Sequence, residues 1–306
     1  MSIIIHGGLK ISKRKISEEA VKELENALNI GVENLKSGSA IDAVVEAVAY
    51  MEDSPYFNAG VGSSLNLEGI AEFDASVMDG STLRYGGVGA VKNVKNPVRL
   101  ARKIMEETGH SLIVGEGAEK LAVKYGLTGE VRTTERVKQM YKTFIKELRS
   151  GGGYEYFQWV RKYLEHGTVG AVALDRDGNI AAATSTGGLW LKLPGRVGDT
   201  PTPGCGTYAD SRAGGCSGSG IGEAGMRLCT AKRVVDLLSQ GYNSWQACRI
   251  AIGEVESKLS LKFGVIALDR RGNVGYYHNG YAFYIAYQTN GKRLSGALNR
   301  NGEPVQ

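Results

Sequence analysis

One threonine in the sequence could serve as a nucleophile and supply its own base. Thr168 follows His166 and Gly167, and cleavage of the Gly167–Thr168 bond would leave Thr168 at a new N-terminus. Its hydroxyl and its free α-amine would then lie on adjacent carbons, and an α-amine titrates at roughly pH 7.7–8. Such an amine can accept the hydroxyl proton without a histidine or an aspartate. The tripeptide is therefore compatible with self-cleavage followed by nucleophilic catalysis, a hypothesis that depends on the surrounding motifs.

An ordinary strand threonine after a glycine loop is the alternative interpretation of this tripeptide. Residues 168–175 (TVGAVALD), a turn at 176–179 (RDGN) and residues 180–186 (IAAATST) predict a hairpin of small and β-branched residues. The stretch from about 130 to 165 is rich in charged residues and tyrosine, and it contains three consecutive glycines. We expect a helix followed by a mobile linker there, so that Thr168 lies at the junction of linker and strand.

The first half of the chain predicts a helical hairpin and paired strands. Ser17 precedes apolar residues at helical spacing up to Gly38, and Ser39 opens a second such run that breaks at Pro55. Short alternation at 70–78 and small apolar residues at 86–91 indicate paired strands. Asn96-Pro97 then opens a helix that continues through Thr108.

The second half repeats the hairpin pattern. Residues 264–269 (GVIALD), 270–273 (RRGN) and 274–278 resemble the hairpin that begins at Thr168. Between the two hairpins, residues 223–240 and 244–255 have the apolar periodicity of helices. This order of elements predicts an α+β protein with layered sheets flanked by helices.

Several longer motifs, found in one order along nearly the whole chain, carry a family resemblance. They are His6-Gly7-Gly8, 57–62 (FNAGVG), 74–80 (DASVMDG), 166–175 (HGTVGAVALD), 184–188 (TSTGG), 192–199 (KLPGRVGD), 204–210 (GCGTYAD) and 218–223 (GSGIGE). On these motifs the sequence resembles the plant-type asparaginase and isoaspartyl peptidase family of N-terminal-nucleophile hydrolases. The resemblance implies hydrolysis of asparagine to aspartate and ammonia, and of β-aspartyl (isoaspartyl) dipeptides, through a β-aspartyl ester of the nucleophile.

The resemblance also implies which residues catalyse the reaction. Thr168 matches the nucleophile that is released by cleavage after Gly167, and Thr186 matches the threonine whose hydroxyl bonds to it. Ser219 and Gly220 match a hydroxyl and a backbone N–H that stabilise the developing oxyanion. Ser219 replaces the family's usual threonine, and the lost methyl group leaves its side-chain torsion freer.

Substrate binding is assigned in the same way. Arg196 offers a planar fork for the substrate's α-carboxylate, and Asp199 offers an anion for its α-ammonium. A surface ion pair is the alternative for these two residues. The backbone amide of Gly222 matches one that approaches the carboxylate.

Three further positions have weaker assignments. Asn58 matches an asparagine packed near the nucleophile, although Asn before Ala-Gly is also typical of turns. The loop from about Met51 to Val61 resembles one that binds sodium through backbone carbonyls, so no metal is expected on side chains and no cofactor is required. His6 stands in HGGLK rather than the family's HGGAG, and we expect a structural role for it.

The resemblance further implies a fold and an assembly. The fold would be a four-layer αββα sandwich formed by residues 1–306 as a single folding unit. Self-cleavage would divide it into an α segment, 1–167, which includes the linker at about 130–167, and a β segment, 168–306. The mature form would be a homo-oligomer of cleaved protomers, (αβ)2.

Composition argues against several other classes of protein. The net charge of +5 is modest for 306 residues and its basic residues are scattered, which disfavours nucleic-acid binding. The four cysteines include no C-x-x-C pair, and the four histidines are isolated, so no zinc spacing is present. The apolar run at Ile3–Ile5 is too short for a signal peptide, and no stretch is long enough for a membrane span. We therefore expect a cytoplasmic protein.

Three alternatives remain open. Gly220, Gly222 and Gly225 fit the dinucleotide-binding pattern G-x-G-x-x-G, but the residues before them do not resemble a hydrophobic strand, and Asp236 falls inside an expected helix. A glycosylasparaginase usually has Asp before the nucleophile, where this chain has Gly167. The third alternative is an inactive homologue that is never cleaved.

Overall fold

A large mixed sheet forms the centre of the molecule. The computed structural model describes residues 1–13, 15–129, 133–150, 167–289 and 291–305. The sheet has the strand order β12-β11-β1-β5-β6-β2-β3-β4, and all neighbours are antiparallel except β3 and β4. Its strands are β1 (Ser2–Lys10), β2 (Phe73–Asp79), β3 (Tyr85–Val91), β4 (Leu112–Val114), β5 (Val169–Leu174), β6 (Ile180–Thr186), β11 (Ala282–Thr289) and β12 (Lys292–Leu298).

A smaller antiparallel sheet packs against the large one. Its order is β10 (Val274–His278), β9 (Phe263–Asp269), β8 (Gly214–Gly220), β7 (Thr207–Asp210). Side chains that alternate along the strands, such as Ile4, Val172 and Ile266, form the core between the two sheets. Because β5 and β6 are covered on both faces, every one of their residues is buried. This explains their small, continuously apolar sequences.

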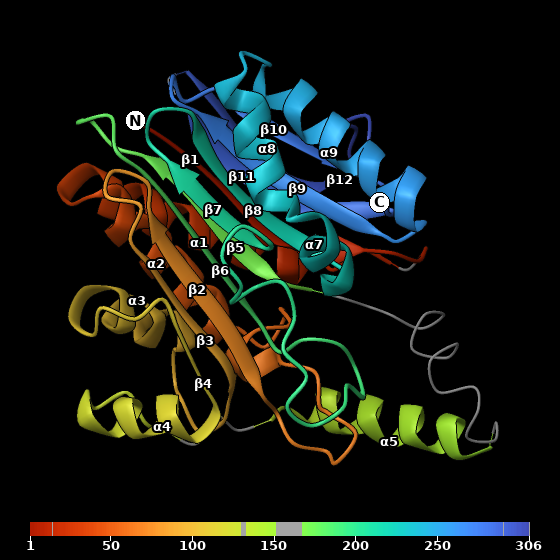
Figure 1. Ribbon diagram of the computed structural model, residues 1–306. Coiled ribbons are helices and arrows are strands. Elements are labelled where there is room, and N and C mark those ends of the chain that lie inside the picture. The colour runs from red at the N-terminus through yellow and green to blue at the C-terminus, as the bar shows by residue number, and fades with distance from the viewer. Residues whose placement is uncertain (14, 130–132, 151–166, 290, 306) are drawn as a thin grey trace.

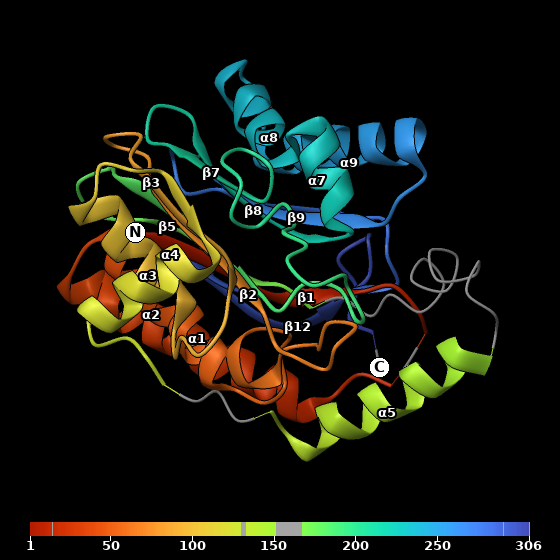
Figure 2. The ribbon, with the colours of Figure 1, turned by 60° about the horizontal axis from the view of Figure 1, so that its bottom comes forward.

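Helices cover the outer faces of the two sheets (Figures 1 and 2). On the large sheet lie α1 (Glu18–Ser37), α2 (Ala40–Asp53), α3 (Pro97–Glu107) and α4 (Gly115–Lys124). On the small sheet lie α7 (Gly222–Leu228), α8 (Thr230–Ser239) and α9 (Ser244–Leu259). A short 3-10 turn, η1, spans Gly60–Gly62, and α5 (Glu135–Ser150) packs its Phe144 against Trp190 at the edge of these layers.

The local helix and turn signals are confirmed. Ser17 caps α1 through its side chain, and Ser39 forms a reciprocal capping box with Asp42 at the start of α2. The strands at β2 and β3 pair as expected, and the two similar hairpins are β5–β6 and β9–β10. The helix within the charged stretch is α5, while the expected linker at 151–166 lies outside the described residues.

One predicted helix is wrong. The pattern at 223–240 indicated a single helix, but the structure has two, α7 and α8, that meet at Cys229. Cys229 has φ +48°, a left-handed conformation that a continuous helix cannot contain. The break turns α8 onto the small sheet, where Val234 and Leu238 are buried. Apolar spacing continues through the break, which is why the sequence pattern missed it.

Among the residues described, no helix has both the length and the apolar character needed to cross a bilayer. The same residues contain no cluster of three or more metal-ligating His, Cys, Asp or Glu side chains.

Candidate active site

The β5–β6 hairpin places two threonine hydroxyls together. Thr168 directly precedes β5, and Thr186 ends β6, so the antiparallel register that pairs Val169 with Ser185 brings the two threonines opposite each other. Thr168 Oγ1 donates to Thr186 Oγ1 at 3.3 Å, and both residues are buried. Thr186 Oγ1 also accepts the Gly188 N–H at 3.0 Å, which fixes the orientation of its hydroxyl. The sequence-predicted pair is therefore in contact.

The Gly167–Thr168 bond lies against a glycine at the end of β1. Gly8 has φ +107°, and a Cβ built on it would lie 2.5 Å from Gly167 Cα and 3.2 Å from the Thr168 nitrogen. No side chain fits there, and the backbone conformation itself favours glycine. Gly8 therefore allows β1 to approach the bond that is predicted to break.

Asn58 also lies close to Gly167. A Cβ at Gly167 would be 3.3 Å from Asn58 Cβ. The Asn58 amide donates to the Gly188 carbonyl at 2.8 Å and accepts the Ser64 N–H at 2.7 Å, so it ties its own loop to the segment after β6. Asn58 thus packs beside Gly167, the residue before the predicted nucleophile.

Ser219 and Gly220 end β8 and meet the same end of β1. Ser219 is buried, and its Oγ accepts the Leu9 N–H at 3.1 Å, which leaves the hydroxyl proton available for donation. Gly220 has φ +142°, and a Cβ there would lie 2.6 Å from the Lys262 carbonyl oxygen. The small sheet therefore brings these residues to Leu9, the neighbour of Gly8.

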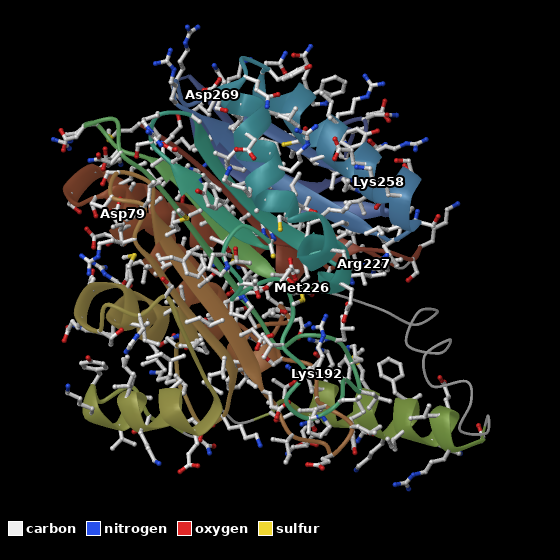
Figure 3. All side chains as sticks on the ribbon, in the orientation of Figure 1. Asp79, Lys192, Met226, Arg227, Lys258 and Asp269 are labelled. Atoms are coloured by element: carbon white, nitrogen blue, oxygen red, sulfur yellow. The ribbon has the colours of Figure 1, made fainter. Side chains whose placement is uncertain are left out.

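Arg196 and Asp199 lie in the loop between β6 and β7, residues 187–206, which also carries Lys192 (Figure 3). Arg196 is not an exposed surface residue: its side chain is 16% exposed and is bound by Glu223 in the first turn of α7. Its Nε and Nη2 donate to Glu223 Oε1 at 3.1 and 2.9 Å, and Nη2 also donates to Oε2 at 2.9 Å. A carboxylate therefore already occupies the guanidinium fork that was predicted to bind one.

Asp199 is a buried carboxyl group beside this fork. A Cβ on Gly222 would lie 2.7 Å from Asp199 Oδ1 and 2.8 Å from Arg196 Nη2, so Gly222 adjoins both side chains. Asp199 Oδ2 is buried and has no hydrogen-bond partner among the described residues. Burial raises the pKa of Asp199 to about 7, and the nearby positive charge of Arg196 only partly opposes this. A cationic group placed beside Asp199 would therefore restore its charged form.

Two glycines of the G-x-G-x-x-G pattern, Gly222 and Gly225, pack against Asp199 rather than leaving space for a phosphate. A Cβ on Gly225 would lie 2.7 Å from Asp199 Cβ. The expectation that no strand precedes the pattern is wrong, because β8 ends at Gly220. However, β8 is antiparallel to both β7 and β9, and Asp236 lies within α8. The parallel strand–helix–strand unit that dinucleotide binding requires is therefore missing here.

Tight glycine turns shape the loop at 51–61. A Cβ on Gly60 would lie 2.1 Å from the Glu52 carbonyl oxygen, and one on Gly62 would lie 2.0 Å from that of Phe57. Only glycine permits the backbone at these two positions to pass the carbonyls so closely. On the Gly167 side of the predicted scissile bond, a cavity of about 230 Å³ is lined by residues that include Asn58, Gly167 and Trp190.

Sequence reasoning missed two residues of this site. Glu223 was interpreted only as the start of a helix, and nothing in the local sequence links it to Arg196, 27 positions earlier. Gly8 belongs to a quoted motif, yet its approach to Gly167 depends on the pairing of β1 with β5, which is a long-range contact.

The chain is similar to known proteins along nearly its whole length. A model of the Asparaginase family matches residues 1–295. A plant-type L-asparaginase of Pyrococcus horikoshii is 40% identical, over 95% of this chain and 97% of that protein. An isoaspartyl peptidase/L-asparaginase of Danio rerio is 42% identical, over 88% and 86% of the two chains. An isoaspartyl peptidase of Escherichia coli is 38% identical, over 99% and 98%.

Proposed function

We propose a function from one premise: the chain belongs to the Asparaginase family. The function is hydrolysis of the side-chain amide of L-asparagine and of the β-aspartyl bond in isoaspartyl peptides. The observation that carries the proposal is the contact between Thr168 Oγ1 and Thr186 Oγ1, 3.3 Å apart, at the residue that cleavage after Gly167 would make N-terminal. The names of the relatives supply the substrate class, and this contact supplies the chemistry.

In the proposed mechanism, cleavage frees the α-amine of Thr168, which then accepts the proton of its own hydroxyl. Thr168 Oγ1 attacks the amide carbonyl carbon, and the negative oxygen is stabilised by the Ser219 hydroxyl and the Gly220 N–H. The tetrahedral intermediate collapses to a β-aspartyl ester as ammonia, or an amino acid, takes up the proton and leaves. Water then hydrolyses the ester and regenerates the free hydroxyl.

The substrate is held at its other end. Arg196 binds the α-carboxylate bidentately, Asp199 binds the α-ammonium, and the Gly222 amide approaches the carboxylate. The enclosed, unpartnered Oδ2 of Asp199 and the carboxylate already bound by Arg196 support this pair of roles. The positive charge of Arg196 and the negative charge of Asp199 also favour a substrate whose aspartyl group is zwitterionic over an amide without these charges.

The finer features of the family are proposed with the activity. The two helix-covered sheets support the proposal of a four-layer αββα sandwich, which self-cleavage would divide into 1–167 and 168–306 without separating the parts. An (αβ)2 assembly and a cytoplasmic location stay predictions. A sodium ion in the loop at 51–61 would be held by backbone carbonyls, the ligand type that hard cations prefer.

The function is tested by incubating the purified chain and then following two products. We expect a smaller fragment whose N-terminal sequence begins TVGAVALD, together with ammonia from asparagine and free amino acid from β-aspartyl dipeptides. A single uncleaved chain of 32.8 kDa without either product would instead indicate the inactive homologue. Preferential cleavage of a glycosylated asparagine would favour the glycosylasparaginase alternative.

Gly8→Ala should slow self-cleavage by about tenfold or more, since the methyl group would displace the scissile bond from a geometry set to within tenths of an ångström. The fraction of cleaved chain over time, measured on denaturing gels, checks this. Gly178→Ala is the matched control, because Gly178 also has positive φ (+84°) but no atom within 4 Å of a built Cβ. Both variants carry the backbone strain, and only Gly8→Ala should delay cleavage. Equal cleavage rates in the two folded variants would contradict this role of Gly8.

Glu223→Gln should lower KM for asparagine, because the substrate carboxylate must displace Glu223 from Arg196. Glu223 is 46% exposed, so its ion pair is worth at most ~1 kcal/mol, and KM should fall by roughly fivefold or less. Initial rates at varied asparagine concentration measure this change. Glu254→Gln, which removes the Arg233 ion pair between α8 and α9, is the control and should leave KM unchanged. A raised KM in Glu223→Gln would mean that Glu223 orients Arg196 instead of competing for it.

A further inference from the structure

A continuous row of polar groups crosses the otherwise apolar space between the two sheets. Its six residues are all fully buried. The links join His6 Nε2 to Ser217 Oγ (2.9 Å), Ser217 Oγ to Thr184 Oγ1 (2.7 Å), Thr184 Oγ1 to Thr207 Oγ1, Thr207 Oγ1 to Ser76 Oγ (2.8 Å) and Ser76 Oγ to the Thr200 carbonyl oxygen (2.6 Å). We call these groups the hydroxyl chain.

The two ends of the hydroxyl chain lie at the two halves of the active site. His6 pairs with Gly170, two residues after Thr168. A Cβ on Gly170 would lie 2.5 Å from His6 Nε2 and 2.0 Å from Ser217 Oγ, so glycine there leaves room for the link between the sheets. At the other end, Thr200 directly follows Asp199. The hydroxyl chain therefore joins the strand that begins at the nucleophile to the segment that carries the proposed ammonium ligand.

The donor directions in the hydroxyl chain leave His6 Nε2 free to donate. Ser76 gives its single proton to the Thr200 carbonyl or to Thr207, and Thr207 donates to Thr184. Thr184 can donate to the Gly206 carbonyl at 3.5 Å, and Ser217 can then donate to Thr184. The Ser217 oxygen is thereby available to accept a proton from His6 Nε2.

His6 is neutral in this arrangement. Burial lowers the pKa of His6 to about 3, and the nearby Thr168 backbone opposes this only partly. A neutral imidazole carries one proton, so a proton on Nε2 leaves Nδ1 without one. Consistent with this, Nδ1 has no hydrogen-bond partner among the described residues.

We propose that His6 is a positioning residue, which acts through the hydroxyl chain to hold the Asp199–Thr200 segment at a fixed distance from Thr168. This role rests on the proposed function. Buried polar groups weaken a core unless they find hydrogen-bond partners, and a connected network of them favours one arrangement of the surrounding elements. The hydroxyl chain thus gives a reason for six polar groups to interrupt an apolar interface.

The test uses both ends of the hydroxyl chain. Ser76→Ala and His6→Phe should each raise KM for asparagine about tenfold, the effect of one buried hydrogen bond, with a smaller change in kcat. The double variant should raise KM no further, because either single substitution already interrupts the hydroxyl chain. Independent structural roles predict instead that the two effects multiply, and that result would overturn the proposal.

Rescue separates positioning from simple packing. Gln carries an N–H near the position of His Nε2, so His6→Gln should keep KM within about twofold of the wild-type value. Melting temperatures confirm that each variant folds. An equal rise of KM in His6→Gln and His6→Phe would overturn the proposal, because the N–H would then be irrelevant.

Nitrogen NMR provides a readout that does not depend on activity. The imidazole signals of the full chain, assigned by their loss in His6→Gln, should show His6 as the neutral tautomer protonated at Nε2. A proton at Nδ1 would overturn the proposal even in an active enzyme. If His6 carries its proton on Nε2 but the protein does not hydrolyse asparagine, the hydroxyl chain would still stand. Only the proposed function would then be rejected.

Discussion

Thr168→Ala should yield a single 32.8 kDa chain that releases no ammonia from asparagine. The substitution removes the hydroxyl that attacks Gly167 during self-cleavage and the substrate carbonyl during turnover. Loss of a covalent nucleophile typically reduces kcat by about 10⁴-fold or more, because the remaining groups cannot form the ester. Denaturing gels and an ammonia assay after prolonged incubation measure the two losses.

Two controls show whether the missing hydroxyl is the cause. Thr168→Ser keeps the hydroxyl and should still be cleaved, at a reduced rate because its side-chain torsion is freer. Thr186→Val removes only the hydroxyl that accepts from Thr168, so it should slow both reactions less than Thr168→Ala does. Appearance of the fragment beginning at residue 168 in Thr168→Ala would exclude the proposed mechanism of cleavage.

Local chemistry made part of the fold predictable. Ser17 and Ser39 satisfy exposed N–H groups at helix starts through their own side chains, a signal contained within four residues. The hairpins β5–β6 and β9–β10 join strands that are adjacent in sequence, so the turns at 176–179 and 270–273 were sufficient to indicate them. These predictions needed no knowledge of distant contacts.

Long-range pairing was not predictable in the same way. Nothing around Ile3–Ile5 indicates that β1 lies between β5 and β11, more than 160 and 270 residues away. The glycine-rich β8 lacks the apolar alternation of a strand, yet all its residues are buried because the large sheet and the helices enclose it. The conformation of Cys229 likewise follows from how α7 and α8 pack, which single-sequence periodicity does not report.

For the candidate site, the sequence identified residues but not their present partners. Thr168 and Thr186 were expected in contact and are. Arg196, Asp199 and Gly222 come together, but only the structure shows Glu223 bound in the Arg196 fork. Motif resemblance indicates which residues bind substrate. Which protein groups contact those residues before the substrate binds depends on tertiary packing.

Asp199→Asn should reduce kcat/KM for asparagine by about 10²–10³-fold at pH 8, because the substrate ammonium would lose its buried anionic partner. In the wild-type protein, burial raises the pKa of Asp199 to about 7. The free enzyme should therefore lose kcat/KM as the pH falls through 7, when Asp199 becomes protonated. The Thr168 amine has an ordinary pKa of roughly 7.7–8, so its protonation should cause a second loss of kcat/KM as the pH falls. The pH–rate profile of Asp199→Asn should retain only the limb of the amine.

The substitution Asp199→Asn should lower activity but raise stability at pH 8. This difference separates a role in binding from damage to the fold. The folded-state pKa of Asp199 lies above its unfolded value of 3.8, so the folded chain binds the proton more tightly and loses stability as pH rises from about 4 to 7. Asparagine cannot ionise and avoids this loss. Asp199→Asn should thus melt at a higher temperature than the wild-type protein at pH 8 while being far less active. A variant that is less active and also less stable at pH 8 would show that Asp199 supports the fold, and the ammonium site would have to be sought elsewhere.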